Sequence, residues 1–435
     1  MWFDESVIYQ IYPLGYLGAP EKNDGKLEHR ILKIIEHIDH LKKMNINMVY
    51  FCPIFESSTH GYDTKDYAQL DCRLGTNDDF AVLCKELHNH GIKVIIDGVF
   101  NHVGREFFAF ADVQKNKRDS IYKDWFYINF DGNSNYNDGF YYEGWEGHYE
   151  LVKLNLDNPD VKNYLLKCIG LWIEKFQIDG LRLDVAYMLN KNFMKELRQF
   201  VSSKNPEFFL LGEVIHGDYN TIVNNEMLHS ATNYECYKGV YSSLNEMNMF
   251  EISYSLNRQF GSESWCLYTG KNMVSFIENH DVSRIASALK NPNHLNLAFG
   301  LLMTMPGIPC IYYGSEWGIL GEKQQGTDAS LRPKVESPIF NDVSKFVSQL
   351  CKIRIENPVL SYGGFKNLHI TNHQYAFERT LNEKRVVVLL NASESDYAFD
   401  LNFGVGEGVD LLTNMKISFS NPIVVSGYSI LIIEC

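Results

Sequence analysis

Long hydrophobic runs and a regular cysteine pattern are both missing from this sequence. The nine cysteines include no CxxC pair, and several lie inside apolar stretches, as Cys168 and Cys310 do. This arrangement is typical of reduced core residues and argues against a disulfide framework. Residues 1–13 carry acids where a signal peptide has a basic start, and no later run reaches membrane-spanning length. We therefore predict a cytoplasmic protein that does not bind or cross a membrane.

Positive charge is also in short supply. The chain has 40 lysines and arginines against 54 aspartates and glutamates, which gives a formal net charge of −14. This balance argues against nucleic acid and anionic membranes as partners, because both attract basic surfaces. No internal repeat or low-complexity linker interrupts the 435 residues, which are enough for one large domain with one or two small ones. A neutral small molecule is the expected substrate.

Short apolar runs alternate with amphipathic helical patterns up to about residue 356. They predict strands at 7–13, 47–55, 93–100, 180–186, 208–214, 232–236, 273–279 and 309–314, of which 232–236 is the weakest. Because these runs are apolar on both faces, they are typical of a parallel sheet covered by helices. Eight strands that are each followed by a helix predict an α/β fold, a (β/α)8 TIM barrel. Strand counting alone leaves a doubly wound sheet as the alternative.

The helical segments carry recognisable start and stop signals. Thr76 with Asp79 resembles a capping box, and the helix that it opens is expected to stop at Gly91. Asn158 followed by Pro159 predicts the start of another helix, which leads into the strand at 180–186.

Two regions break the alternation and define the predicted domains. Residues 103–153 contain no clear helix–strand unit and are rich in Asn, Asp, Gly, Tyr and Trp, which predicts a functional B domain inserted after the third strand. Beyond residue 360 the pattern is purely β, with strands expected at 373–381, 385–393, 396–402 and 428–434. The predicted domains are a barrel of residues 1–102 and 154–357, the B domain at 103–153 and a C-terminal β-sandwich at 358–435.

Four of the predicted barrel strands end in or next to acidic residues, which are Asp97, Asp184, Glu213 and Asp281. A single acid at a strand end is usually a loop or helix cap. Four together, two of them with a histidine nearby in the sequence, are hard to explain as caps. Catalytic groups of a (β/α)8 barrel lie at the carboxyl ends of its strands, so the four acids are candidate catalytic residues.

Paired carboxylates are what glycoside hydrolysis requires, one as nucleophile and one as proton donor. Arg182 lies two residues before Asp184 and points to the same side of the strand, so we expect its charge to hold Asp184 ionised. Glu213 follows an apolar strand with no base nearby in sequence. Burial is therefore expected to raise the pKa of Glu213, which suits a general acid and base.

Several motifs match a known family. DGVFNH (97–102), GLRLDVA (180–186), GEV (212–214) and FIENHD (276–281) resemble, in this order, the four signature regions of the α-amylase superfamily, glycoside hydrolase family 13. YQIYP (9–13), HGYDTKDY (60–67) and GIPCIYYGSE (307–316) add to the resemblance. It covers nearly the whole chain.

The resemblance implies a role for each matching residue. Asp184 corresponds to the nucleophile of a β-glycosyl-enzyme, Glu213 to the acid/base, and Asp281 to the third acid, which favours the distorted sugar ring. The chemistry would be retaining, with the carboxyls of Asp184 and Glu213 about 5–5.5 Å apart. The implied substrate-binding residues are Tyr62, Asp97, His102, Arg182, His280 and Arg284.

LVKLN (151–155), GEVIH (212–216) and HDVSR (280–284) resemble the neopullulanase and cyclomaltodextrinase group. The expected activity is hydrolysis of α-1,4 bonds in maltooligosaccharides, with cyclodextrins as further candidates. The alternatives are a 4-α-glucanotransferase, an α-1,6-active oligosaccharide glucosidase, and a non-catalytic glucan-binding relative, which the three acids argue against. Members of the group usually begin with an additional β-domain that supports dimerisation, whereas the first predicted strand starts near Met1, so the oligomeric state stays open.

No cofactor is expected, and calcium is the one candidate ion. Secreted amylases carry a lysine and a histidine soon after the nucleophile, where this chain has Tyr187 and Met188, so the usual inter-domain calcium site is incomplete although Asn101 remains. The loop 132–139 offers oxygen atoms but lacks the acidic spacing of a calcium loop. The aromatic side chains of the insertion fit either sugar stacking or the core of a small domain. They are Tyr141, Tyr142, Trp145 and Tyr149.

Overall fold

The structure, a computed structural model, describes residues 1–401, 406–420 and 422–435. Its centre is an eight-stranded sheet in the order β13-β12-β11-β5-β2-β1-β15-β14, in which all neighbouring strands run parallel. The strands are β1 (Ile8–Ile11), β2 (Met48–Phe51), β5 (Lys93–Gly98), β11 (Gly180–Leu183), β12 (Phe209–Gly212), β13 (Ser230–Ala231), β14 (Val274–Phe276) and β15 (Ile308–Tyr312).

A single contact point closes this sheet into a barrel. Thr232, directly after β13, forms a parallel bridge with Val274 of β14, and the neighbouring Asn233 N–H donates to the carbonyl of Val274 at 2.8 Å. The two ends of the strand order therefore meet. The predicted (β/α)8 barrel is confirmed, and the doubly wound sheet is excluded.

Six of the eight predicted barrel strands contain the observed ones, a seventh (309–314) overlaps β15, and the weakest was misplaced. Residues 232–236 were predicted as a strand, but the strand is β13, two residues upstream, and helix α7 (Tyr234–Glu246) begins inside the predicted range. The cause is local, because the Asn233 side chain accepts a hydrogen bond from the Cys236 N–H at 3.1 Å and so caps the helix.

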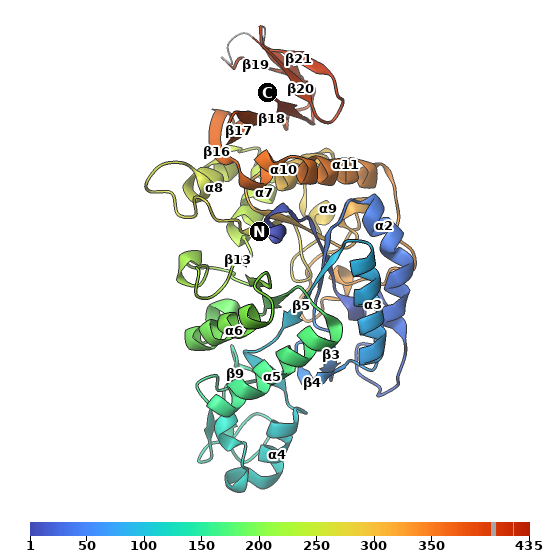
Figure 1. The fold of residues 1–435 in the computed structure, drawn as a ribbon, viewed down its shortest axis with the longest axis vertical. Coiled ribbons are helices and arrows are strands. Elements are labelled where there is room, and N and C mark those ends of the chain that lie inside the picture. Colours follow the sequence, from blue (N-terminus) through green and yellow to red (C-terminus); the bar gives the residue numbers. More distant parts are fainter. Residues whose placement is uncertain (402–405, 421) are drawn as a thin grey trace.

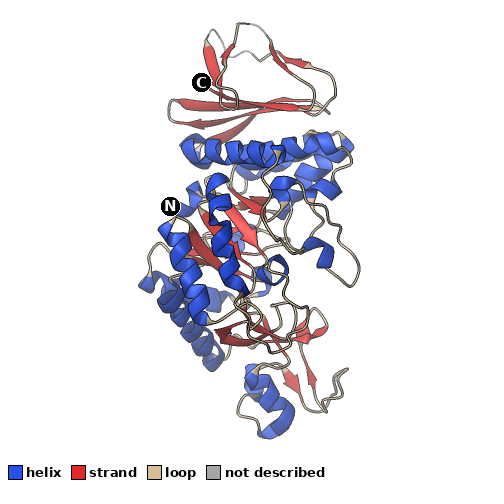
Figure 2. Cartoon of the chain, turned by 90° about the vertical axis from the view of Figure 1, so that its right-hand side faces the viewer, coloured by secondary structure: helices blue, strands red, loops and turns tan. Residues whose placement is uncertain are grey.

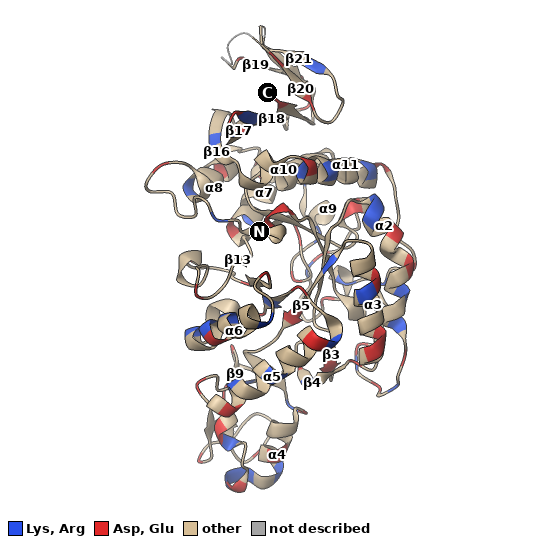
Figure 3. Ribbon diagram, in the orientation of Figure 1, with Lys and Arg blue, Asp and Glu red and all other residues tan. Residues whose placement is uncertain are grey.

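Helices surround the barrel (Figures 1 and 2). They are α1 (Pro13–Tyr16), α2 (Ile38–Lys43), α3 (Asn77–Asn89), α5 (Pro159–Phe176), α6 (Lys191–Lys204), α7, α8 (Phe250–Phe260), α9 (Ile285–Ala288), α10 (Leu295–Thr304), α11 (Asp342–Glu356) and α12 (Pro358–Tyr362). Both predicted helix starts are confirmed. Thr76 and Asp79 form a capping box, and the Asn158 side chain caps α5 by accepting from the Asp160 N–H. The charged residues lie mainly on these outer helices and on loops (Figure 3).

The segment after β5 forms a small body at one end of the molecule (Figure 1). Its main sheet has the order β6-β10-β9 and contains β6 (His102–Gly104), β9 (Gly144–Trp145) and β10 (His148–Lys153). The sequence showed no clear helix here, yet the segment contains α4 (Phe108–Asn116). A second unpredicted element is the hairpin of β3 (Phe55–Ser57) and β4 (Thr64–Leu70), whose connection carries Tyr62.

The C-terminal part is a β-sandwich at the opposite end, beyond the barrel helices (Figure 2). Its larger sheet contains β16 (Gly364–Ile370), β17 (Gln374–Leu381), β18 (Lys384–Asn391), β23 (Ser429–Glu434), β20 (Glu407–Asp410) and β21 (Lys416–Ser418), and its smaller sheet β19 (Tyr397–Phe399) and β22 (Ile423–Val425).

Side chains that alternate along β18 pack into two different hydrophobic cores. Val386, Val388 and Leu390 belong to the core shared with the barrel, whereas Val387 and Leu389 face a separate core under the smaller sheet. Three of the predicted strands here overlap observed ones. The fourth, 396–402, contains β19 and ends on a position outside the described residues. The exact domain boundaries stay a prediction.

Within the described residues, no helix combines the length and the apolar composition needed to cross a membrane.

Candidate active site

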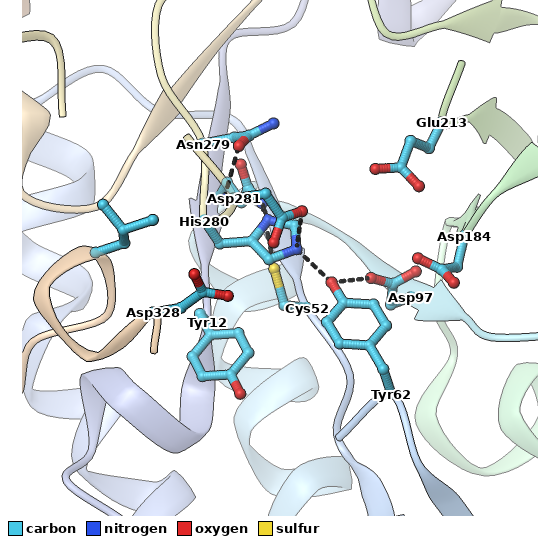
Figure 4. A network of polar contacts seen from close by, with 12 residues as sticks. Tyr12, Cys52, Tyr62, Asp97, Asp184, Glu213, Asn279, His280, Asp281 and Asp328 are labelled. Carbon is cyan, nitrogen blue, oxygen red and sulfur yellow. Dashed lines mark hydrogen bonds and ion pairs between the residues drawn. The ribbon is translucent and has the colours of Figure 1, made fainter. Parts of the chain in front are cut away.

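The four predicted acids lie together at the carboxyl ends of the barrel strands (Figure 4). Asp97 lies in β5, Asp184 directly follows β11, Glu213 directly follows β12, and Asp281 lies in the loop after β14. Because parallel strands end at the same rim of a barrel, chain positions far apart in the sequence meet here.

Arg182 of β11 connects three of the four acids. Its Nη1 lies 2.8 and 2.9 Å from the two carboxylate oxygens of Asp97 and 2.9 Å from Asp184 Oδ1, and its Nη2 lies 2.8 Å from Glu213 Oε1. All four side chains are buried. Glu213 has no base nearby in the sequence, but parallel pairing of β11 and β12 brings Arg182 beside it in the fold.

Charge balance in this cluster favours a bound proton. One guanidinium neutralises one of three carboxylates, and the remaining charges are buried. Burial raises the pKa of Asp184 well above its usual range, and the Glu213 charge adds to the effect while Arg182 opposes it. Burial likewise raises the pKa of Glu213, as expected, against Arg182. The expectation that Arg182 alone would hold Asp184 ionised does not agree with the raised pKa.

Val185, directly after Asp184, has a backbone conformation that is rare for its residue type. Its φ is 48°, in the left-handed region, which a β-branched residue adopts only when its surroundings impose it. In this conformation the Val185 N–H donates to Glu213 Oε2 at 2.9 Å. This hydrogen bond, made possible by the strained backbone, fixes the Glu213 carboxyl relative to the loop after Asp184. Nothing in the sequence indicated it.

Asp97 is occupied by protein donors on both oxygens. Besides Arg182 it accepts from the Tyr50 hydroxyl at 2.8 Å and the Tyr62 hydroxyl at 3.3 Å, and it is 1% exposed. Its position fits a residue that orients Arg182 and Tyr62. The position of Asp97 therefore does not support the direct contact with a substrate that the resemblance implied.

His280 links Tyr62 to Asp281. Its Nδ1 lies 2.8 Å from the amide nitrogen of Gln10, which can only donate, so the proton of a neutral ring is on Nε2. Nε2 contacts the Tyr62 hydroxyl and lies 3.0 Å from Asp281 Oδ2. Burial lowers the pKa of His280 to about 3, so the ring is neutral at ordinary pH.

Asp281 has a second partner that sequence analysis missed. Arg332 Nη2 lies 2.9 Å from Asp281 Oδ1 and 2.9 Å from Asp328, and the guanidinium is 4.5 Å from the ring centre of Tyr12. Burial acts to raise the pKa of Asp281, but His280 and Arg332 outweigh it and the pKa is lowered. Because His280 is neutral, Arg332 is the cation that keeps Asp281 ionised.

His102 completes the wall around Asp184. Its Nε2 lies 3.9 Å from Asp184 Oδ2, and its Nδ1 lies 3.2 Å from the amide nitrogen of Asn101. Burial lowers the pKa of His102 to about 3, so this ring is also neutral. A neutral imidazole next to the carboxylate can donate one hydrogen bond to a bound molecule.

Arg284 is the one predicted site residue that does not join the others. It is fully buried, and its guanidinium donates to Glu278 Oε1 at 2.8 Å and to the carbonyls of Tyr313 and Leu331, both at 2.7 Å. Its positive charge and its hydrogen-bond donors are therefore paired with other protein groups. The prediction that Arg284 binds substrate is therefore not supported by its position.

The acids with the spacing of a metal site are paired with arginines. In the loop 132–139, both Asp138 oxygens bind Arg105, at 2.8 and 3.0 Å. Among the described residues, one group has suitable spacing for a metal ion, and it is formed by Glu56, Asp71 and Cys72. Both Asp71 oxygens accept from Arg73, at 2.8 and 2.6 Å, so this group is also occupied by protein.

A comparison with protein families identifies the architecture. The description "Alpha amylase, catalytic domain" matches residues 10–349. The chain belongs to the α-amylase family. It is a glycoside hydrolase, and its barrel, its insertion after β5 and its four converging acids are those expected from the family resemblance.

Individual relatives place it among enzymes of one kind. A cyclomaltodextrinase from Thermoanaerobacter pseudethanolicus is 33% identical, over 95% of this chain and 74% of the relative. An intracellular maltogenic amylase from Bacillus subtilis is 30% identical, over 90% and 69% respectively. A solved cyclomaltodextrinase structure superposes with a TM-score of 0.86 at 28% identity, covering 100% of this chain and 78% of that one. Membership of the α-amylase family agrees with the group that the short motifs indicated.

Proposed function

We propose that this α-amylase-family protein is a retaining hydrolase of α-1,4-glucosidic bonds in maltooligosaccharides and cyclodextrins. The observation that carries the proposal is the placement of Asp184 and Glu213 on either nitrogen of one buried guanidinium, at the catalytic rim of the barrel. Two carboxyls that share a proton and face one cleft are the equipment for glycosyl transfer through a covalent intermediate.

In the first step Asp184 attacks the anomeric carbon while Glu213 donates a proton to the leaving glucosidic oxygen. The C–O bond to the leaving sugar breaks, and a bond from that carbon to Asp184 forms. In the second step Glu213 takes a proton from water, and the resulting hydroxide displaces Asp184 with a second inversion. The two inversions give net retention. Burial raises the pKa of both carboxyls, so this pair retains a proton, and the proton on Glu213 leaves Asp184 as the ionised nucleophile.

The surrounding residues supply hydrogen bonds of fixed direction. Asp281, ionised by Arg332, accepts from sugar hydroxyls, and the neutral His102 ring pairs with them through Nε2, which has no protein partner among the described residues. The N–H of His280 is engaged with Tyr62 and Asp281 and orients both. Tyr62 lies beside Asp97 and His280 with its ring available as a platform for the sugar face (Figure 4).

The relatives support the choice of substrate and place. Cyclomaltodextrinases act on cyclic maltodextrins by name, and the intracellular maltogenic amylase supports a cytoplasmic location. The acidic net charge supports a neutral sugar as partner and not nucleic acid. Because its candidate metal ligands bind arginines, the enzyme is proposed to need no calcium.

The test is a product analysis by chromatography and proton NMR on maltotriose, pullulan and β-cyclodextrin. We expect shorter maltooligosaccharides whose new reducing end is first in the α configuration. Products longer than the substrate would indicate a glucanotransferase, and cleavage of the α-1,6 linkages of pullulan would indicate the α-1,6 alternative. A first product in the β configuration would overturn the retaining mechanism. An Asp184→Asn variant, expected to lose at least about 1,000-fold in kcat, is the control for contaminating activity.

A further inference from the structure

Two buried ring nitrogens beside the proposed nucleophile have no hydrogen-bond partner among the described residues. They are His102 Nε2 and Trp145 Nε1. The two rings are neighbours, with centroids 5.9 Å apart, and His102 Nε2 lies 3.9 Å from Asp184 Oδ2, too far for a hydrogen bond. Leaving a buried polar group unpaired is unfavourable, because the group has lost its hydrogen bonds to water. Two adjacent cases at a catalytic rim indicate a ligand that pairs with both.

The indole nitrogen always carries a hydrogen and therefore donates, whereas Nε2 of a neutral imidazole donates or accepts according to the tautomer. The missing partner must therefore offer an acceptor oxygen to Trp145 and a group that pairs with either tautomer of His102. Sugar hydroxyls meet this requirement, and they do so without bringing a further negative charge next to Asp184.

Trp145 is held firmly in this place by the small sheet of the inserted segment. β6, which starts at His102, pairs with β10, and β10 pairs with β9, where Trp145 is opposite His148. The Trp145 ring stacks on the His148 ring, with centroids 5.5 Å apart and planes 22° apart. A Cβ atom at Gly144 would collide with the carbonyl oxygen of His148, so the two strands approach closely. The indole is thus preorganised between two histidines.

The turn of the same hairpin lies near the loop after Asp184. Burial and then the charge of Glu146, followed by Glu213 and Asp184, raise the pKa of Tyr187 to about 12, so Glu146 lies close to Tyr187. Tyr187 is three residues after the nucleophile. The turn that joins β9 to β10 is therefore a neighbour of the loop that follows the nucleophile.

The other aromatic residues of the insertion have different surroundings. Tyr142 is fully buried and donates to the carbonyl of Tyr149 at 2.8 Å, and the two rings pack at 5.5 Å. Tyr141 packs edge-on against Tyr149 at 6.1 Å. These three form the core and surface of the small body. Trp145 alone among the four contacts a residue of the catalytic rim.

We propose that Trp145 is a substrate-contacting residue, whose indole N–H, next to His102, donates to a hydroxyl oxygen of the sugar ring held at Asp184. The inference rests on the proposed function, because it takes a glucosyl unit as the ligand. It makes the inserted segment a part of the sugar site and not only a wall beside it.

The test measures binding without turnover, in Asp184→Asn enzyme titrated with maltotriose by calorimetry and by tryptophan fluorescence. Adding Trp145→Phe keeps the ring and removes only the N–H, so we expect a dissociation constant about 5- to 10-fold higher and loss of the fluorescence change. The matched control is Trp317→Phe, because Trp317 is also half-buried and edge-on to a histidine, His40, but on the outer side of the barrel. We expect the control to bind like the parent.

Unchanged affinity and an unchanged fluorescence signal in the Trp145→Phe enzyme would overturn the proposal. The fluorescence response of the Asp184→Asn parent tests it even if Trp145→Phe folds poorly, since no change in emission on saturation with sugar would also contradict a contact with the indole. A wild-type enzyme that binds maltotriose without cleaving it would refute the proposed function alone. Kinetics give an independent readout: kcat/KM of Trp145→Phe in otherwise wild-type enzyme should fall by a similar factor on p-nitrophenyl α-maltoside, and a normal value would contradict the contact.

Discussion

At the scale of single residues, the unusual feature is one guanidinium that contacts three buried carboxyls. Arg182 holds Asp97, Asp184 and Glu213 within 2.9 Å, and the excess negative charge is a cost that the barrel bears for its chemistry. Such a cluster predicts that removing one acid relieves repulsion while it abolishes activity. Stability and function are then expected to change in opposite directions.

The first prediction concerns the pH dependence of stability in Asp184→Asn. Because the pKa of Asp184 is raised on folding, the folded state binds more protons than the unfolded state above about pH 4, and wild-type stability falls as pH rises through this window. Asparagine does not titrate. The melting temperature of the variant minus that of wild type should therefore increase from pH 4 towards pH 8, by about 2 °C or more. Thermal unfolding at a series of pH values measures it.

The matched control is Asp179→Asn, for which the sign is reversed. Burial acts to raise the pKa of Asp179, but bonds from His88, Lys93 and the Val94 N–H outweigh it and lower the pKa. This acid stabilises the folded state above its unfolded pKa and loses that contribution as pH falls. The Asp179→Asn variant should therefore melt below wild type at pH 8. If Asp184→Asn also melted below wild type at pH 8, the account of the cluster would be wrong.

A second prediction separates structural from substrate-binding roles for Arg284. Replacing it with methionine leaves the buried Glu278 without its cation and removes donors from two carbonyls, which should cost about 3–5 kcal/mol of unfolding free energy. Denaturant unfolding measures the loss. At a temperature where the variant stays folded, we expect KM for maltotriose to stay within about twofold of wild type. A large rise in KM with normal stability would restore the role that the sequence suggested.

Much of the site could be predicted because strand ends are visible in a sequence. Asp184 and Glu213 follow apolar runs directly, so their convergence followed from the barrel itself. Arg332 could not be found in this way, because it lies in a long loop region after β15 and reaches Asp281 only through the folded chain. The strained backbone of Val185 left no trace either, since valine is an ordinary strand residue.

At the scale of elements, the connection between α5 and β11 leads into the strand before Asp184. It begins with an exposed residue whose backbone is strained. Gln177 caps α5 in the left-handed conformation, with φ 55° and ψ 36°. Glycine adopts this conformation without the penalty of about 1–2 kcal/mol that other residues pay.

The third prediction is that Gln177→Gly stabilises the protein by about 1 kcal/mol with unchanged kcat and KM. Denaturant unfolding and initial rates on maltotriose check it. The control is Asn205→Gly at the end of α6, where the backbone is extended with φ −147° and glycine brings no advantage. Equal gains in the two variants would mean that relief of strain is not the cause.

Elements with strong local signals were predicted well, and those defined by distant contacts were not. The capping residues of α3 and α5 fixed both helix starts. Strand β13 has only two residues, so its sequence offered no pattern to read, and it exists because β12 provides a neighbour. Helix α4 is stabilised by burial of Ala109, Phe110 and Val113 within an insertion whose composition resembles a loop.

At the scale of the whole molecule, the barrel carries a β-sandwich at one end and the inserted body at the other (Figure 1). Contacts of α8, α10 and α12 with strands of the larger C-terminal sheet join the sandwich to the barrel. Side-chain packing between these helices and the sheet therefore joins the two parts of the molecule.

The fourth prediction follows for metal removal. Prolonged dialysis against EDTA should leave kcat unchanged and the melting temperature within about 1 °C, because the aspartates that could bind calcium are paired with Arg105 and Arg73. Calcium at 100 times its dissociation constant would stabilise a protein by about 2.7 kcal/mol. A clear rise in melting temperature on adding calcium back would contradict this and locate an ion at a site not considered.

The order of strands in the barrel also determines when each strand can pair with its neighbours during synthesis. β1 pairs on one side with β2 and on the other with β15, so that Ile8 meets Cys310. At about 5–20 residues per second, on the order of fifteen seconds to a minute separates the emergence of these two partners from the ribosome. The sheet of the inserted body, by contrast, uses only residues 102–153 and is available within seconds. During translation one edge of β1 therefore stays unpaired until the chain has passed residue 312. A chain whose synthesis stops earlier has a sheet with an exposed edge that can pair with other chains.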